Sequence, residues 1–293
     1  MGHHHHHHPP PSEASEHRLW YAVAANMALT LAQVIGGLVS GSLSLVADAL
    51  HNFSDAASLL IALVAIRIGR RPPDQFKTFG YKRAETVAAL INLTTLIIIG
   101  LYLCYEALTR FISPQPIEGW TVVIVAAIAL IIDIFTALLT YSQSKSSLNI
   151  HAVFLHNLTD ALASVGVILT GAAILLYGWV WMDALMTLLI AGYVLWQGLA
   201  HIPTAIHLLM EGSPDGINME DVITAMELQN GVNDVHHVHI WCLDEHRNAL
   251  EAHVVLEEKA DMDTVKHTLK TLLHDRFRIE HSTLEFESRH CEC

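Results

Sequence analysis

Charged side chains are scarce in this sequence. Asp, Glu, Lys and Arg make up only 15% of the 293 residues, whereas hydrophobic residues make up 52%. Soluble domains hold about 25% charged residues, so the shortage excludes an ordinary soluble protein. The composition predicts a membrane protein, or a chain with a large membrane-embedded part.

Basic residues are the scarcer of the two charge types: the chain has 16 of them against 29 acidic ones, which gives a net charge of −13. Residues 213–293 alone hold 17 acidic and 7 basic side chains. Binding to nucleic acid requires a positive surface, so the sequence argues against a nucleic acid partner. An acidic excess favours a cation as the partner.

Cysteine is rare as well. Cys104 and Cys242 stand alone, and only Cys291 and Cys293 lie close together, so a disulfide framework is excluded. The chain also lacks the HExxH motif of zinc proteases and a glycine-rich phosphate loop. These absences argue against the enzymes that depend on such motifs.

No cleavable signal pattern precedes the first hydrophobic stretch. The chain starts with MGHHHHHHPPP, and residues 1–17 form a His- and Pro-rich tail. This run of histidines fits either an expression tag or a natural metal-collecting tail. The fold prediction therefore begins at residue 18.

Six hydrophobic stretches are long enough to cross a bilayer as helices, because about 20 apolar residues span its hydrocarbon core. They cover residues 19–39, 43–68, 84–111, 120–141, 150–177 and 180–209. Short segments rich in turn-forming residues, such as SGS at 40–42 and RRPPD at 70–74, separate them. We therefore expect a bundle of six transmembrane helices over residues 18–210.

The loops between these stretches predict the orientation, because Lys and Arg concentrate in cytoplasmic loops. The second loop and its edges hold Arg67, Arg70, Arg71, Lys77, Lys82 and Arg83. Lys145 lies in the fourth loop, whereas the loops after the first and fifth stretches have neither Lys nor Arg. With the second and fourth loops inside, six spans place both termini in the cytoplasm.

Residues 211–287 have the composition of a soluble domain. NMEDVITAMEL predicts a helix capped by Asn218, VHHVHIWCL and ALEAHVVLE alternate as strands, DMDTVKHTLKTLLHDRF predicts a second helix, and STLEFE predicts a last strand. The order αββαβ predicts a cytoplasmic α+β domain of ferredoxin-like type, with two helices covering one face of the sheet. A His/Cys tail follows at residues 288–293. The predicted fold class is thus a membrane all-α six-helix bundle plus this domain.

One five-residue pattern occurs twice inside hydrophobic stretches: HNFSD begins at His51, and HNLTD begins at His156. Residues four apart lie on one face of a helix. His51 and Asp55 therefore share one helix face, and His156 and Asp160 share another. An ionisable group at membrane depth costs about 2.5–3.5 kcal/mol on insertion scales. If the two pairs face each other, they form a group of four ligands, two nitrogens and two oxygens.

The ligand types of this group favour zinc. Two imidazoles and two carboxylates suit Zn²⁺, whereas Mg²⁺ and Ca²⁺ prefer sites built from oxygen. A single buried His–Asp pair is more often a structural hydrogen bond, but two pairs with the same spacing favour a metal site. Matches at equal offsets, such as Ala47 with Ala152 and Leu50 with Leu155, indicate a weak internal repeat in which each half supplies two ligands.

Three polar neighbours lie beside these pairs. Asp48 precedes His51 by three residues and so falls on the same helix face. Asn52 and Asn157 each follow a His directly and lie about 100° round the helix. We expect the two Asn side chains to form hydrogen bonds between helices rather than to bind metal.

Four segments carry a resemblance to a known family. SGSLSLVADALHNFSD and HAVFLHNLTDALASVGV contain the repeated patterns, TFGYKRAETVAALIN opens the third stretch, and LMEGSPDGI follows the sixth. In this order they resemble signatures of the cation diffusion facilitator family of metal/proton antiporters. The resemblance extends from residue 20 to about residue 287.

The resemblance implies that His51, Asp55, His156 and Asp160 are the ligands of a transport site, and that His at the first position favours Zn²⁺. It also implies a homodimer whose cytoplasmic domains bind metal at their interface. The fourth stretch departs from the family at Asp133, where many relatives have Asn. This Asp is either a second proton carrier or, as we expect, a hydrogen-bond partner.

The cytoplasmic domain holds a looser set of candidate ligands. VHHVH supplies three of them, and strand alternation predicts His237 and His239 on one face of the strand and His236 on the other. The resemblance points to His236 as a metal ligand, together with His253 on the next strand.

On the last strand the resemblance points to Glu285 as the third ligand, with Glu287 as a further candidate. Glu stands there in place of an expected His, so histidines on the surface of an acidic domain are the alternative interpretation. The terminal HCEC offers one imidazole and two thiolates. It either completes a metal site or lies in solvent.

The predicted function is efflux of a divalent cation, chiefly Zn²⁺, from the cytoplasm in exchange for protons. Metal binding requires neutral imidazole, so Zn²⁺ and protons compete for one site, and imidazole titrates near neutral pH. Cd²⁺ and Co²⁺ are further candidate cargoes, and Zn²⁺ is also a candidate regulatory ion. The resemblance places the protein in the plasma (inner) membrane. Two other classes stay open: a membrane metal sensor, and an intramembrane metalloenzyme whose ion activates water.

Overall fold

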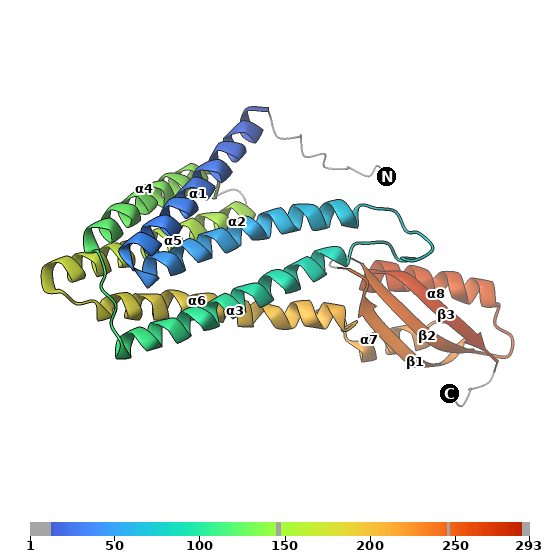
Figure 1. The fold of residues 1–293 in the computed structure, drawn as a ribbon. Coiled ribbons are helices and arrows are strands. Elements are labelled where there is room, and N and C mark those ends of the chain that lie inside the picture. Colours follow the sequence, from blue (N-terminus) through green and yellow to red (C-terminus); the bar gives the residue numbers. More distant parts are fainter. Residues whose placement is uncertain (1–12, 145–147, 245–246, 289–293) are drawn as a thin grey trace. The chain divides into compact units, whose positions relative to one another are not determined.

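The computed structural model describes residues 13–144, 148–244 and 247–288, and Figure 1 labels their helices and strands. Six long helices come first: α1 (Glu13–Ser40), α2 (Leu43–Gly69), α3 (Ala84–Ile112), α4 (Gly119–Ser144), α5 (Leu148–Tyr177) and α6 (Trp181–Leu209). The smaller elements follow: α7 (Met219–Glu227), β1 (Val232–Cys242), β2 (Asn248–Leu256), α8 (Met262–Phe277) and β3 (Ile279–Glu287). The order αββαβ predicted for the C-terminal part is confirmed.

The six predicted spans correspond to α1–α6. Within the described residues, α2–α6 are long and apolar enough to cross a membrane, and α1 has an apolar portion at Met27–Ser40. The turn between α1 and α2 is tight because Gly41 adopts a φ of 72°, in the left-handed region that favours glycine. The prediction of a six-helix membrane bundle is confirmed.

The chain forms two compact units. One comprises Met1–Leu60 and Asn92–Ala200, and the other comprises Ile61–Ile91 and His201–Cys293. The second unit therefore contains the α2–α3 loop and the helix residues on both sides of it, together with the small α+β domain. The domain boundaries at residues 17, 210 and 287 were predicted from changes in composition, whereas these units are defined by contacts. The predicted boundaries therefore stay a prediction.

The first unit has a core of small and branched apolar side chains. The buried residues are Leu43, Leu45, Ala47, Leu103, Ala107, Val122, Ala126, Val167, Ala184, Ile190 and Ala191. Small residues allow helices to approach closely in a membrane. A Cβ added at Gly171 would lie 2.8 Å from Cγ2 of Val123, so α5 passes close to α4 there.

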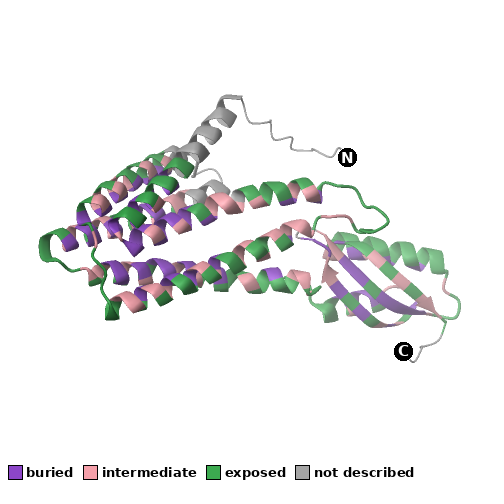
Figure 2. Cartoon of the chain, viewed as in Figure 1, coloured by how far each residue is buried: buried purple, intermediate pink, exposed green. Residues whose placement is uncertain are grey.

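Large apolar side chains cover the outside of the long helices. On α3, for example, Leu101, Tyr105 and Leu108 are all more than half exposed. Figure 2 shows exposed and intermediate positions along the whole length of α3. Such surfaces are unfavourable in water but suit hydrocarbon, in which helices satisfy their own backbone hydrogen bonds. The chain is a multi-pass membrane protein.

The α+β part of the second unit is a three-stranded sheet in the order β1-β2-β3. β1 pairs with β2 in antiparallel fashion, and β2 pairs with β3 in parallel through the crossover helix α8. α7 and α8 pack against one face of the sheet through Val222, Met226, Val265, Leu269 and Leu273. Asn218 caps α7, accepting from the backbone N–H of Glu220 at 2.9 Å, as predicted.

Candidate metal centre

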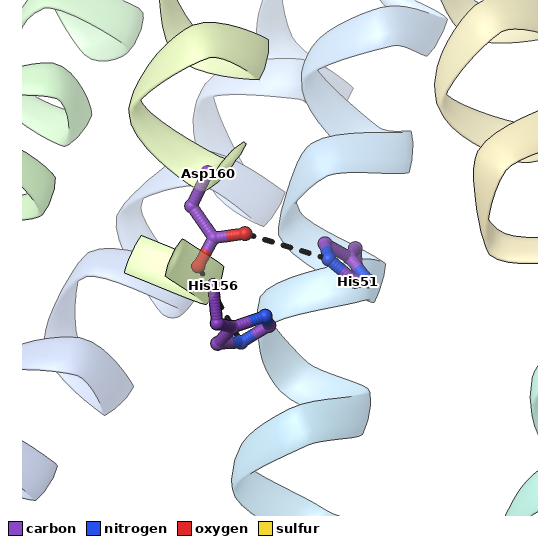
Figure 3. Close-up of side chains that lie close together, drawn as sticks. All are labelled: His51, His156 and Asp160. Atoms are coloured by element: carbon purple, nitrogen blue, oxygen red, sulfur yellow. Dashed lines mark ion pairs between the residues drawn. The ribbon is translucent and has the colours of Figure 1, made fainter. Parts of the chain in front are cut away.

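Four side chains from the two repeated patterns meet inside the first unit. His51 and Asp55 lie one turn apart on α2, and His156 and Asp160 lie one turn apart on α5. Figure 3 shows Asp160 between the two imidazoles. The sequence predicted this group, and the fold brings all four members together.

The nitrogen–oxygen distances in this group are nearly uniform. His51 Nε2 lies 3.7 Å from Asp55 Oδ2 and 3.5 Å from Asp160 Oδ1. His156 Nε2 lies 3.1 Å from Asp55 Oδ2 and 3.5 Å from Asp160 Oδ2. Each imidazole therefore faces both carboxylates, and three of the four separations exceed the usual hydrogen-bond length of about 2.7–3.2 Å.

The most buried polar atoms of the group have unused bonding capacity. Within the described part of the chain, both ring nitrogens of His51, Oδ2 of Asp55 and Oδ1 of Asp160 are buried and have no hydrogen-bond partner. Orphaned buried polar atoms cost roughly 1–3 kcal/mol each, and they are rare unless the site serves a ligand. His156 and Asp55 are half-buried, so the group is accessible along one side.

Asp48 does not join this group. Its carboxylate is buried and accepts a hydrogen bond from Gln33 Nε2 of α1 at 2.6 Å. The same Gln33 accepts from Asn52 Nδ2 at 3.1 Å. Asn52 thus links α2 to α1, which confirms the prediction for this residue. Gln33 was missed from the sequence, although an amide in the middle of an apolar stretch was a usable signal.

Asp133 of α4 is also buried and accepts a hydrogen bond from Ser164 Oγ of α5 at 2.8 Å. The hydrogen bond expected at this position is present, and the alternative role as a second proton carrier stays a prediction. The ring centroid of Tyr193 of α6 lies 6.2 Å from that of His51, and the two rings are nearly perpendicular. This neighbour was not predicted from the sequence.

A second group lies on the sheet face opposite α7 and α8. His236 on β1, His253 on β2 and Glu287 on β3 have ligand atoms within 4.8 Å of one another. His253 Nδ1 lies 2.6 Å from Glu287 Oε1, and His236 Nε2 lies 3.6 Å from Glu287 Oε2. His236 Nδ1 also lies 2.9 Å from Asp234 Oδ2, which fixes the orientation of its ring.

The structure places Glu285 at the edge of this second group. Its Oε2 lies 3.7 Å from His253 Nε2, and its side chain is 70% exposed. Glu287, predicted only as a further candidate, lies in the centre and is largely buried. The terminal HCEC and the N-terminal histidines lie outside the described residues.

The predicted alternation of VHHVH is wrong. The pairing of β1 with β2 shifts register between His236 and His239, and His237 adopts a φ of 49°. Such a bulge places two successive side chains on the same side of a strand. The His237 ring accordingly lies 5.0 Å from the His253 ring, and the His236 ring lies 5.5 Å from it. The histidines of β1 therefore share the outer face of the sheet.

Comparison with protein families accounts for almost the whole chain. Residues 19–210 match the cation efflux transmembrane domain, and residues 214–289 match the cytoplasmic domain of cation efflux proteins. Together the two matches include both groups of candidate ligands.

Several curated proteins are similar over most of their length. The metal cation efflux system protein CzcD of Cupriavidus metallidurans is 37% identical, over 95% of this chain and 88% of its own. A cadmium, cobalt and zinc/H(+)-K(+) antiporter of Bacillus subtilis is 36% identical, over 87% of this chain and 84% of its own. The zinc transporter ZitB of Escherichia coli is 35% identical, over 94% of this chain and 88% of its own.

Among solved structures, the metal-bound C-terminal domain of the CzcD transporter of Cupriavidus metallidurans is similar to the C-terminal part of the chain. The match covers 24% of this chain and 99% of that domain, with 32% identity and a TM-score of 0.24.

Proposed function

Because the chain belongs to the cation diffusion facilitator family, we propose that it exports divalent metal cations, chiefly Zn²⁺, in exchange for protons. The His51, Asp55, His156 and Asp160 group is the transport site. The four nitrogen–oxygen distances of 3.1–3.7 Å are the observation that supports this assignment.

Two of these distances, from each imidazole to one oxygen of Asp160, equal the edges of a tetrahedral zinc site, and the two distances to Asp55 lie close to them. With Zn–N and Zn–O bonds of about 2.0–2.2 Å, neighbouring ligand atoms of a tetrahedron lie roughly 3.3–3.6 Å apart. A hydrogen-bonded His–Asp pair would instead be about 2.7–2.9 Å apart when charged. His51, His156 and Asp160 have ligand atoms within 4.8 Å of one another, and Asp55 lies beside both imidazoles, so the group supports a coordination shell for the cargo ion.

The donor set favours zinc over the harder cations. Half of the ligand atoms are imidazole nitrogens, which Mg²⁺ and Ca²⁺ seldom take. Cd²⁺ and Co²⁺ bind the same donor types and are further cargoes. The Bacillus subtilis relative is named for cadmium, cobalt and zinc.

Protons and metal compete for the two imidazoles. Zn²⁺ binds only neutral His and ionised Asp, so protonation of the site expels the ion, and metal binding releases protons. A site that faces the two sides of the membrane in turn would load metal in the cytoplasm and load protons outside. A proton gradient directed inward then drives efflux of the metal.

The protein is a transporter and not an enzyme or a sensor. The relatives over nearly the full chain are named as efflux proteins and transporters.

The His236, His253 and Glu287 group is a second metal site with a regulatory role in this proposal. Zn²⁺ bound there would be a regulatory ion rather than cargo. The cytoplasmic domain of the matched family is described as a dimer domain, which supports a homodimer. We place the protein in the inner membrane with both termini in the cytoplasm, as the Lys and Arg in the second and fourth loops indicate.

Reconstitution into sealed liposomes tests the function. The full chain is inserted into vesicles that contain a Zn²⁺ dye and a pH dye, and a Zn²⁺ gradient is applied. We expect Zn²⁺ movement together with opposite proton movement, and dissipation of the pH gradient should stop uptake against a Zn²⁺ gradient. Zn²⁺ movement with no proton movement would contradict antiport, and binding with no flux would contradict transport.

A further inference from the structure

A buried carboxylate on α6 holds the N-terminal end of α2, the helix that carries His51 and Asp55. Asp183 is fully buried. Its Oδ1 accepts hydrogen bonds from Ser42 Oγ and Ser44 Oγ, both at 2.6 Å. Its two oxygens also accept from the backbone N–H groups of Leu43 at 2.8 Å and Ser44 at 3.2 Å.

These bonds are those of a helix cap supplied from a distant part of the chain. The first N–H groups of a helix lack partners within it, and a negative charge near them is stabilised by the helix dipole. Ser42, the adjacent residue, accepts from the Leu45 N–H at 3.2 Å and donates to Asp183. The cap of α2 is thus shared between its own Ser42 and a carboxylate 141 positions later.

Arg110 of α3 joins the same cluster. Its Nη1 donates to the carbonyl oxygen of Gly41 at 2.5 Å and lies 3.8 Å from Asp183 Oδ2. A Cβ at Gly41 would lie 2.8 Å from the carbonyl oxygen of Pro116, so the turn has no room to shift toward the α3–α4 loop. A buried charge is tolerated when it is paired and hydrogen-bonded, and here both conditions are met.

At the depth of the metal group, α2 is held separately. Gln33 of α1 bonds both Asp48 and Asn52, on either side of His51. His51 itself is eight residues from the start of α2, or about 12 Å along the helix axis. The ligand positions are therefore supported by α1, and the attachment through Asp183 fixes a different point of the same helix.

We propose that Asp183 is a positioning residue for transport. It anchors the N-terminal end of α2 to α6 and α3, so that α2 turns about this end when the site changes the side it faces. The inference rests on the proposed transport function. It assigns Asp183 to the movement of the site rather than to the binding of the ion.

The variant Asp183→Asn tests this role. Asn keeps the size and one acceptor oxygen, but it replaces the other oxygen with an NH₂ that cannot accept from a backbone N–H. In proteoliposomes we expect the maximal Zn²⁺ flux to fall about tenfold or more, as when an interaction needed only for turnover is lost. The Zn²⁺ concentration at half-maximal flux, and the Zn²⁺ dissociation constant of the purified full chain, should stay within about threefold.

Two further variants separate positioning from general damage. Asp183→Glu keeps the charge and should retain more flux than Asp183→Asn. Thr187→Val removes an equally buried hydroxyl one turn along α6, whose bond goes to the Asp183 backbone oxygen at 2.7 Å, and should transport as the unaltered chain does. Normal flux in Asp183→Asn, or equal loss of flux and of Zn²⁺ binding in Asp183→Asn and Thr187→Val, would overturn the proposal.

Amide hydrogen exchange tests the bonds between Asp183 and the start of α2 without a transport measurement. In the full chain, the amides of Leu43 and Ser44 should exchange faster in Asp183→Asn than in the unaltered chain, because their acceptor is weakened. Unchanged exchange at both amides would overturn the anchor even if the Zn²⁺ flux of Asp183→Asn falls. Failure of the unaltered chain to transport Zn²⁺ would overturn the proposed function and leave this exchange result to decide the anchor.

Discussion

The two candidate metal groups contain similar ligands in different arrangements. In the first unit, His51, Asp55, His156 and Asp160 lie at nitrogen–oxygen distances of 3.1–3.7 Å, and several of their atoms have no hydrogen-bond partner among the described residues. On the sheet, His253 and Glu287 already form a hydrogen bond of 2.6 Å.

The difference concerns what an arriving ion must displace. At the proposed transport site the ligands are held apart by helix geometry, so an arriving ion would break few hydrogen bonds. At the sheet site the ion must replace the His253–Glu287 bond, which offsets part of its binding free energy. We therefore expect the two sites to differ in their sensitivity to ligand loss, and substitutions at the two sites test this contrast.

The largest effect is expected for Asp160→Ala and Asp55→Ala. Each leaves three ligands, with both imidazoles facing one carboxylate instead of two, so Zn²⁺ flux in proteoliposomes should fall about 100-fold or more, to the level of empty vesicles. Glu287→Ala, which removes a carboxylate from the other group, is the matched control and should retain most of the flux. Near-normal flux in either Asp variant, with folded protein, would refute the assignment of the transport site.

A smaller effect is expected for His51→Asp, which exchanges one nitrogen ligand for oxygen. Three carboxylates discriminate less by geometry and softness, so the ratio of Zn²⁺ to Cd²⁺ flux should fall by about tenfold. Competition between the two ions in the same vesicles measures this ratio. A ratio that does not change would show that His51 does not set the selectivity.

At the sheet site, Glu287→Gln should change the affinity for Zn²⁺ more than the Zn²⁺ flux. This change keeps the size of the side chain but removes its charge, and the affinity of the cytoplasmic site for Zn²⁺ should fall by about tenfold. Calorimetry on the full Asp160→Ala chain, in which the transport site is disabled, isolates this site. Glu280→Gln on the same strand is exposed and serves as the control. Equal affinities in the two Gln variants would exclude Glu287 as a ligand.

The smallest effect is expected away from both groups, at the cap of α8. Asp261 accepts a hydrogen bond from the Thr264 backbone N–H at 3.1 Å, and its bonds to Thr264 lower the pKa of the Asp261 carboxyl. Its stabilising effect is therefore complete above the ordinary Asp range and is lost as the pH falls through the lowered pKa.

Asp261→Ala should accordingly speed amide exchange in the first turn of α8 near neutral pH, and the difference from the unaltered chain should shrink in acid. Zn²⁺ flux should not change. A difference in exchange that is constant down to low pH would mean that the Asp261 charge contributes nothing to the cap.

Local sequence patterns predicted much of this structure. The bounds of the long helices follow from apolar stretches and turn residues, and the His–Asp spacing of four predicted which side chains share a face. Asn218, the predicted cap, lies next to the helix it serves, and so does Asp261, which was not predicted as a cap. Short-range rules suffice for features of this kind.

Features that depend on contacts between distant segments could not be predicted. Gln33 and Asp183 bond to residues 15 and 141 positions away, and no local rule pairs them. The alternation predicted for VHHVH failed for another reason. His237 is left-handed and shifts the register of β1, so His236 lies on the same face as His237 instead of on the opposite face. The exposure of Glu285 relative to Glu287 likewise depends on how β3 pairs with β2.

The cap that α2 receives from α6 has a consequence for synthesis of the protein. When the first hairpin leaves the ribosome, the carboxylate that will bond Leu43 and Ser44 has not yet been translated. Until then the free N–H groups at that end must stay at the water interface or bind the insertion machinery, because hydrocarbon offers them no acceptor. The N-terminal end of α2 can therefore reach its final position only after α6 has been synthesised and inserted. The bonds between Asp183 and the α1–α2 turn form late, although this turn is the first to be made.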